Sequence, residues 1–152
     1  MTALPEDHAA RILDGSPDAI LICDRTGIVR YWNRGAERIF GFANAEIVGA
    51  SMDLIIPERL RGRHWAGWKH AMSTGVTTYD DGQLLAVPAL HKDGRQISIE
   101  FSIQLLKDAN GQVDWVVAVL RDVTERFTRE KASRATANRS LARQGLEPPP
   151  AR

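Results

Sequence analysis

The stretch Ile97-Ser98-Ile99-Glu100-Phe101-Ser102-Ile103 decides the fold, because apolar and polar residues alternate in it without a break. Side chains of a strand point alternately to opposite faces, so this pattern predicts a strand with one buried face. Turn sequences at residues 91–94 and 108–111 bound the stretch. They join it to apolar runs over 83–91 and 115–120, the former with a proline that indicates an edge position or a bulge. The second half of the chain is therefore predicted to be three antiparallel strands.

The first half of the chain repeats the strand signal and then changes to helices. Two β-prone runs over 19–24 and 28–32 flank a glycine-containing turn and predict a hairpin. Asn33 is a suitable N-cap for a short helix that Gly41 would end. Further helical turns follow, and a longer helix is predicted over 57–73. Because apolar strand faces must be covered, we expect an α+β fold with one antiparallel sheet and the helices packed on one face.

Composition limits both the size and the class of the protein. The 152 residues, 43% hydrophobic and 26% charged, suit one soluble domain with short flanks and exclude a complete histidine kinase or cyclase. A net charge of +1 gives no reason to expect a nucleic-acid partner. No apolar run approaches the roughly 20 residues that cross a bilayer, so we expect no membrane partner. The single cysteine, Cys23, excludes an internal disulfide framework and fits a reducing, cytoplasmic location.

Enzyme motifs are not found in the sequence. It has no glycine-rich phosphate loop, no cluster with metal-ligand spacing and no nucleophile elbow. Asp80 and Asp81 lie in a predicted polar loop, where solvation is the default interpretation. We therefore expect a protein without catalytic activity.

Several local patterns, in order along residues 12–128, resemble those of PAS domains. They are Ser16-Pro17-Asp18-Ala19-Ile20, Asp24-Arg25-Thr26-Gly27, Trp32-Asn33-Arg34-Gly35-Ala36-Glu37, Phe40-Gly41-Phe42, Glu46-Ile47-Val48-Gly49, Lys92-Asp93-Gly94 and Arg121-Asp122-Val123-Thr124-Glu125-Arg126. The resemblance implies a five-stranded antiparallel sheet that cups a small cavity against its helices. It also implies flanking N- and C-terminal helices and a role in sensing or protein interaction, usually without catalysis.

The predicted domain limits follow from this resemblance and from the ends of the chain. We expect an N-terminal flanking helix over 1–16, the PAS domain over 17–123, and a C-terminal helix with a disordered proline-rich tail over 124–152. That last segment holds seven lysines and arginines against three glutamates and ends near three consecutive prolines. In multidomain PAS proteins this position joins the sensor to an effector, so the chain is either a stand-alone sensor or a fragment.

The long helix over 57–73 carries a candidate ligand-binding histidine. A stripe with a spacing of four residues runs along it and should face the sheet: Leu60, His64, Trp68 and Met72. A neutral imidazole in such a stripe can ligate iron. Residues 56–64 also resemble the helix of the oxygen-sensing haem PAS kinases, in which the histidine at this position holds the haem iron. The resemblance makes His64 the candidate axial ligand of haem b, with Trp68 beside it.

The same resemblance implies a wall opposite the histidine. Ile99, Phe101 and Ile103 match the apolar distal wall of the haem sensors. Leu85, however, stands where those sensors have an arginine that reaches the distal side. The candidate cofactor site thus keeps the ligand and the wall but lacks the polar distal group, so oxygen binding in the same style is not implied.

Two functions stay open from the sequence. The first is a sensory module that binds a small ligand in its interior, with haem on His64 for gas or redox sensing. The second is a cofactor-free module for protein interaction, in which His64 hydrogen-bonds within the core and Trp68 fills the cavity. The interior could also be empty or take another small molecule. For partners we expect a second copy, through the N-terminal helix or the sheet, and a signalling protein such as a kinase.

Overall fold

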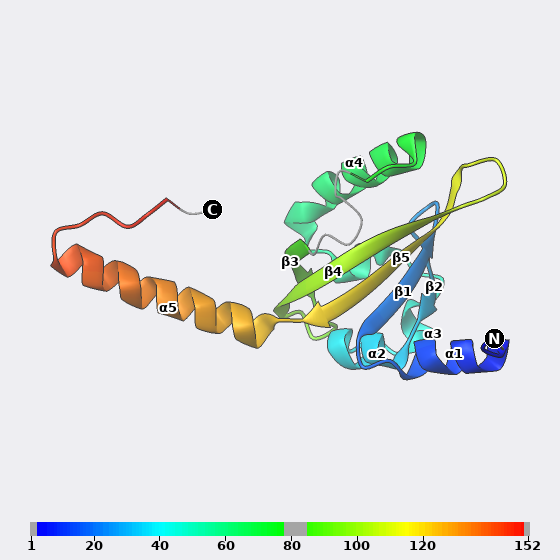
Figure 1. Ribbon diagram of the computed structural model, residues 1–152, viewed down its shortest axis with the longest axis horizontal. Coiled ribbons are helices and arrows are strands. Elements are labelled where there is room, and N and C mark those ends of the chain that lie inside the picture. Colours follow the sequence, from blue (N-terminus) through cyan, green and yellow to red (C-terminus); the bar gives the residue numbers. More distant parts are fainter. Residues whose placement is uncertain (1–2, 78–84, 151–152) are drawn as a thin grey trace. The chain divides into compact units, whose positions relative to one another are not determined.

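A computed structural model describes residues 3–77 and 85–150 (Figure 1). Its elements along the chain are α1 (Glu6–Gly15), β1 (Ala19–Asp24), β2 (Val29–Trp32), α2 (Arg34–Phe40), α3 (Asn44–Ile47), the 3-10 helix η1 (Met52–Ile55), α4 (Glu58–Thr74), β3 (Leu85–Leu90), β4 (Gln96–Lys107), β5 (Val113–Asp122) and α5 (Thr124–Arg143). The predicted polar loop with Asp80 and Asp81 and the first two residues of the predicted 83–91 strand lie outside the described residues.

The strands form one five-stranded sheet in the order β2-β1-β5-β4-β3, and every neighbouring pair is antiparallel. The predicted α+β fold with a single antiparallel sheet is confirmed. Pro88 lies in β3, an edge strand, where its missing N–H removes no hydrogen bond from the sheet interior. The alternation in 97–103 marks only part of β4, because the strand continues to Lys107 through residues that no longer alternate.

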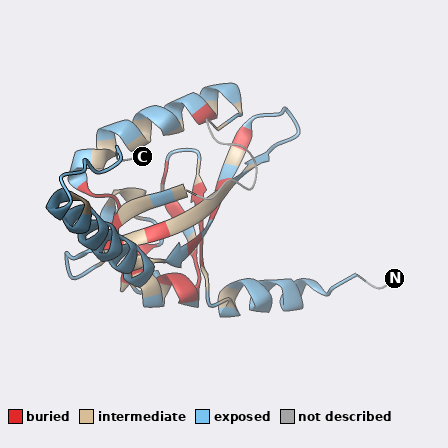
Figure 2. Cartoon of the chain, turned by 60° about the vertical axis from the view of Figure 1, so that its left-hand side comes forward, coloured by how far each residue is buried: buried red, intermediate tan, exposed pale blue. Residues whose placement is uncertain are grey.

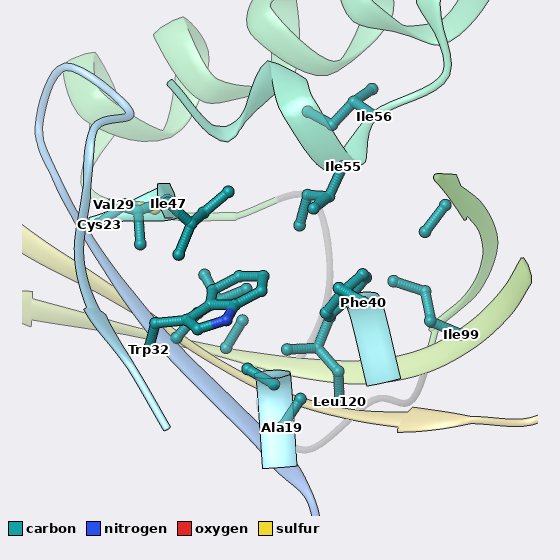
Figure 3. Packing of buried hydrophobic residues seen from close by; sticks show 14 of the residues in the cluster. Ala19, Cys23, Val29, Trp32, Phe40, Ile47, Ile55, Ile56, Ile99 and Leu120 are labelled. Atoms are coloured by element: carbon teal, nitrogen blue, oxygen red, sulfur yellow. The ribbon is translucent and has the colours of Figure 1, made fainter. Parts of the chain in front are cut away.

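The inner face of the sheet carries the core. Register places Ala118 beside both Leu21 and Ile103, and Leu120 beside Ala19 and Phe101, so alternate residues of β1, β5 and β4 share this face. The helices add their own buried side chains to it, among them Ala36, Phe40, Ile47, Ile55 and Ile56. Figure 3 shows Trp32 and Phe40 packed between these helices and the sheet residues Ile99 and Leu120. The helical layer on the inner face fixes where α4 can lie.

Asn33 joins the N-terminal helix to the sheet. Its side chain is fully buried, and its Oδ1 accepts hydrogen bonds from the N–H groups of Ile20 and Ala36 at 2.8 and 2.9 Å. Its Nδ2 donates to the carbonyls of Leu13 and Asp18 at 2.9 and 3.0 Å. The predicted N-cap is confirmed, and the same amide also ties down the chain that leaves α1. Helix α1 itself buries no residue, and Figure 2 shows it exposed along most of its length.

The chain divides into two compact units, Met1–Asp122 and Val123–Arg152. The second contains α5, whose pairs Arg126–Glu130 and Arg129–Glu125 lie four residues apart along the exposed helix. Residues 146–150 contain no helix or strand. The predicted limits at 16, 17, 123 and 124, and the disorder of the tail, stay predictions. None of the helices in the described ranges is long and apolar enough to cross a membrane.

Candidate ligand site on helix α4

Helix α4 presents the predicted stripe to the core. It begins after Pro57, which needs no N–H partner in a first turn, and ends at Gly75, whose φ of 70° suits a left-handed C-cap. Leu60 and Trp68 of the stripe pack against the core cluster. His64 lies between them in the sequence, one turn from each, so the helical period places it on the same side of α4.

His64 buries a polar atom that nothing in the described chain satisfies. Its Nδ1 has no hydrogen-bond partner there, as is also true of Tyr31 Oη and Asp114 Oδ1. Burial lowers the pKa of His64, and the carboxylate of Asp53 opposes that shift only in part. The imidazole is therefore neutral near pH 7 and keeps a lone pair, which is the form that ligates iron. The alternative in which His64 hydrogen-bonds within the core is not seen among the described residues.

Two indole rings flank the imidazole. The Trp65 ring lies 4.6 Å from the His64 ring between centroids, at 81°, and the Trp68 ring lies 5.9 Å away at 38°. Trp65 Nε1 donates to Asp53 Oδ1 at 2.6 Å, and Trp68 Nε1 donates to the Arg25 carbonyl at 2.8 Å. Both indole N–H groups are thus directed to η1 and the β1–β2 turn, which leaves aromatic surface against the imidazole.

The four residues of the predicted wall lie on one face of the sheet. Leu85 pairs with Phe101, and Ile103 pairs with Ala118, a core residue. Ile99 belongs to the same alternate set of β4 and is buried, while the other three are half-buried. The register therefore brings all four to the inner face that Leu60 and Trp68 of α4 also contact. Their role as cofactor-binding residues, with His64 and Trp68, stays a prediction.

Trp65 and Asp53 are the site residues that sequence reasoning missed. Trp65 follows His64 directly, so it projects about 100° around the helix and falls outside a stripe spaced by four. Asp53 lies in a 3-10 helix that precedes α4, and nothing in its sequence context indicates a tryptophan partner. The one available signal was the tryptophan itself, whose indole N–H needs an acceptor when half-buried.

Among the described residues, neither Cys23 nor a group of side chains that commonly bind metals forms a second candidate site beside His64. Burial, together with the nearby charge of Asp24, raises the pKa of the Cys23 thiol to about 12, so the sulfur is not a reactive thiolate. The Cys23 thiol contacts the sulfur of Met52 at 3.8 Å. Across the described ranges, no three histidine, cysteine, aspartate or glutamate side chains gather as a metal-binding group would.

Comparison with known proteins agrees with this architecture. A family model described as the PAS fold matches residues 13–127. The chain belongs to the PAS fold family. This PAS domain is 27% identical over 124 residues to the sensor protein FixL of Bradyrhizobium diazoefficiens. The match covers 79% of this chain and 23% of that protein. It is 26% identical over 116 residues to the oxygen sensor protein DosP of Escherichia coli, covering 76% of the chain and 14% of that protein.

The PAS domain spans about a quarter or less of the length of these two relatives. Among solved structures, it resembles the crystal structure of a PAS domain of a protein from Colwellia psychrerythraea, with a TM-score of 0.68 and 22% identity. That match covers 78% of this chain and 97% of the other. The structural likeness supports the fold, and the two sequence relatives connect the domain to sensor proteins.

Proposed function

We propose that this PAS domain is a sensory module that binds haem b between α4 and the inner face of the sheet, with the imidazole of His64 as axial ligand. The observation that carries the proposal is the buried, unpartnered Nδ1 of a neutral imidazole on the core-facing side of α4. A buried polar atom without a partner costs free energy, about 1–3 kcal/mol, unless a ligand or water satisfies the group.

The surrounding residues fit a flat, largely apolar group. The indoles of Trp65 and Trp68 present ring surface beside His64, and the inner sheet row contributes Ile99 and Phe101. When bound, the haem iron would supply reversible binding of a diatomic gas or a one-electron redox change. The chain's own residues would hold the ring, exclude water and supply one nitrogen ligand. Relatedness to a protein named as an oxygen sensor favours a gas as the signal.

Leu85 restricts what a gas at the iron could contact. An apolar side chain at the start of β3 donates no hydrogen bond, so a bound gas would receive no polar stabilisation from this position. We therefore expect weaker discrimination in favour of oxygen than a polar side chain there would give. Substitution Leu85→Arg should raise oxygen affinity relative to carbon monoxide.

Titration of the purified protein with haemin tests the proposal. Wild type should develop a Soret band at one equivalent, and His64→Leu should shift and weaken that band because the axial nitrogen is lost. His70→Leu provides the matched control, since His70 lies on the same helix but is exposed. An identical spectrum in His64→Leu and wild type would remove His64 as the ligand.

A second candidate function is a cofactor-free interaction module that pairs with another copy. The outer face of the sheet favours it. Leu106 and Trp115 pair across β4 and β5 and are each 39% exposed, and Val119, four residues further along β5, is 37% exposed. Helix α1 adds the exposed side chains of Ile12 and Leu13. Apolar groups concentrated on one side of a sheet commonly mark a protein contact.

Sedimentation of two variants tests the homodimer. Val119→Glu places a charge in the outer apolar row and should convert a dimer to a monomer. Ala66→Glu adds the same charge at an exposed position of α4, outside this row, and should leave the dimer intact. A wild-type protein that stays monomeric at high micromolar concentration would exclude this candidate.

The remaining parts of the proposal concern the cellular context. We propose that the module is non-catalytic, acts in the reducing cytoplasm, and passes its signal to a partner such as a kinase. The buried, protonated thiol of Cys23 suits that compartment, and the similarity to a named sensor protein suits that kind of partner. Co-purification with a candidate kinase, with and without haemin, would test the last part.

A further inference from the structure

The position of α4 depends on a small number of contacts. Within the described chain Ala71 is the single buried residue of the helix, and no side chain caps its N-terminus. Side-chain hydrogen bonds to elements outside the helix and its own linker come from Arg59, Trp65 and Trp68. The arginine contact, to Gln96, is long at 3.3 Å and exposed. The two indoles therefore make the shorter of the hydrogen bonds that hold α4 to the rest of the domain.

The Trp65 ring packs directly on the backbone of Gly27, at a position with no room for a side chain. We call this contact the seat of Trp65. Gly27 is buried with φ of 81°, and a methyl group added there would lie 2.2 Å from Cη2 of the Trp65 ring. The ring therefore rests directly on the β1–β2 turn. Any side chain at this position would push the indole, and with it the adjoining imidazole, away from the sheet.

The seat and the hydrogen-bond acceptor of Trp65 form one unit. The N–H of Met52 donates to the Gly27 carbonyl at 3.0 Å, and Ile28 and Ser51 form a β-bridge. Ser51 Oγ then accepts from the Asp53 N–H at 3.1 Å, which begins η1. Asp53 Oδ1 and the Gly27 surface are thus held in a fixed relation to each other. The 2.6 Å contact with an ionised acceptor is of the strong, charge-assisted kind.

Among the described residues, none forms a hydrogen bond with His64 Nδ1 that would fix the ring. In its place the imidazole meets the Trp65 ring edge to face at 4.6 Å. We propose that Trp65 is the positioning residue of this site: its seat on Gly27 and its bond to Asp53 hold the His64 imidazole toward the inner face of the sheet. The inference rests on the proposed function for its link to haem, but it also makes a claim about the ligand-free protein.

Four variants separate the parts of this arrangement. Gly27→Ala removes the seat, Asp53→Ala removes the acceptor, and Asp53→Asn retains an oxygen that can accept the indole N–H. Trp65→Phe keeps an aromatic ring but loses the N–H. Gly111→Ala is the matched control for the seat, because Gly111 has φ of 78° but nothing within 4 Å of an added methyl group.

The first measurement follows the His64 ring protons by NMR in the ligand-free protein. In wild type, Asp53→Asn and Gly111→Ala, ring currents of the indoles should displace these signals from those of exposed His70. In Gly27→Ala, Asp53→Ala and Trp65→Phe they should move toward the His70 positions. Signals unchanged from wild type in all three would overturn the proposal, whether or not haem binds.

The second measurement is the haemin dissociation constant of the same variants. A positioning group of this type changes metal or cofactor affinity by about 10-fold to 100-fold, so Gly27→Ala and Asp53→Ala should weaken haemin binding by at least about tenfold. Asp53→Asn should recover most of that loss. If wild type binds haemin and Gly27→Ala and Asp53→Ala bind it equally tightly, the positioning role of Trp65 is overturned. No uptake by wild type would refute the haem proposal, and the NMR result would then decide the role of Trp65 alone.

Discussion

Asn33 and His64 are polar side chains on the same core, and they differ in what their polar atoms contact. The amide of Asn33 is fully buried and directs both its oxygen and its nitrogen to backbone groups of three separate segments. The imidazole of His64 buries Nδ1 and contacts indole rings, with no hydrogen-bond partner for that atom in the described chain. The fold thus satisfies one polar group completely and leaves the other available.

This difference separates a structural residue from a candidate ligand. A saturated buried amide stabilises the folded state, because its loss would leave several backbone groups without partners. A buried imidazole nitrogen without a partner costs stability and is free to bind a ligand. The comparison therefore predicts opposite effects on stability when each side chain is replaced by an apolar one.

The largest effect is expected for Asn33→Ala. The substitution leaves the Ile20 and Ala36 N–H groups and the Leu13 carbonyl without their Asn33 partner, and it removes the cap of α2. We expect the free energy of unfolding to fall by about 3–5 kcal/mol in urea denaturation. Asn44→Ala removes an exposed amide whose Nδ2 donates to one carbonyl, at 2.8 Å, and should cost about 1 kcal/mol. Equal losses in the two variants would contradict the special role of Asn33.

The next effect has the opposite sign. His64→Leu replaces a buried unpartnered nitrogen with carbon of similar volume, so the ligand-free protein should gain about 1 kcal/mol of unfolding free energy. Thermal or urea denaturation of the protein freed of haem measures this. A loss of stability larger than about 1 kcal/mol would mean that the imidazole is a structural group like Asn33.

A smaller effect is expected for Asp24, whose carboxylate, like the amide of Asn33, accepts several hydrogen bonds. Burial alone would raise its pKa, but hydrogen bonds from Thr26, Arg30 and the Ile28 backbone outweigh this and lower the pKa from 3.8 to about 2. Because the folded-state pKa is depressed, the stabilisation is complete above the ordinary value and is lost as pH falls through about 2.

Unfolding free energies measured from about pH 5 down to pH 2 test this point. The unfolding free energy of wild type should fall as the pH is lowered across that range. That of Asp24→Asn should be lower than wild type at about pH 5 and should fall by a smaller amount. Asp7→Asn, on the exposed helix α1, should follow wild type. Parallel curves for wild type and Asp24→Asn would show that other carboxylates govern the acid response.

Much of the fold could be predicted because its signals are local. The alternation at 97–103, the capping side chain of Asn33 and the helix end at Gly41 each act within a few residues, and all three predictions are confirmed. Strand ends were less predictable, since the pairing of Leu106 with Trp115 depends on the neighbouring strand and not on alternation. The exposed apolar row on the outer face of the sheet was not predicted either, because β5 is apolar on both faces and shows no alternation.

The candidate site was predictable only in part. His64 and Trp68 could be placed because they share a helical stripe, and strand alternation placed Ile99, Phe101 and Ile103 on one face. The seat of Trp65 could not be predicted, because it joins a turn, a 3-10 helix and α4 through contacts between residues far apart in the sequence. Such contacts leave no periodic pattern in the sequence.

The most direct test of the central claim is chemical rescue of His64→Gly. The glycine variant removes the imidazole, and free imidazole added to the solution can then take its place as the nitrogen ligand of haem bound to the protein. We predict that haemin with His64→Gly lacks the wild-type Soret band and that added imidazole restores it, while His70→Gly keeps the band without addition. A wild-type spectrum in His64→Gly before any imidazole is added would contradict the assignment of His64 as the axial ligand.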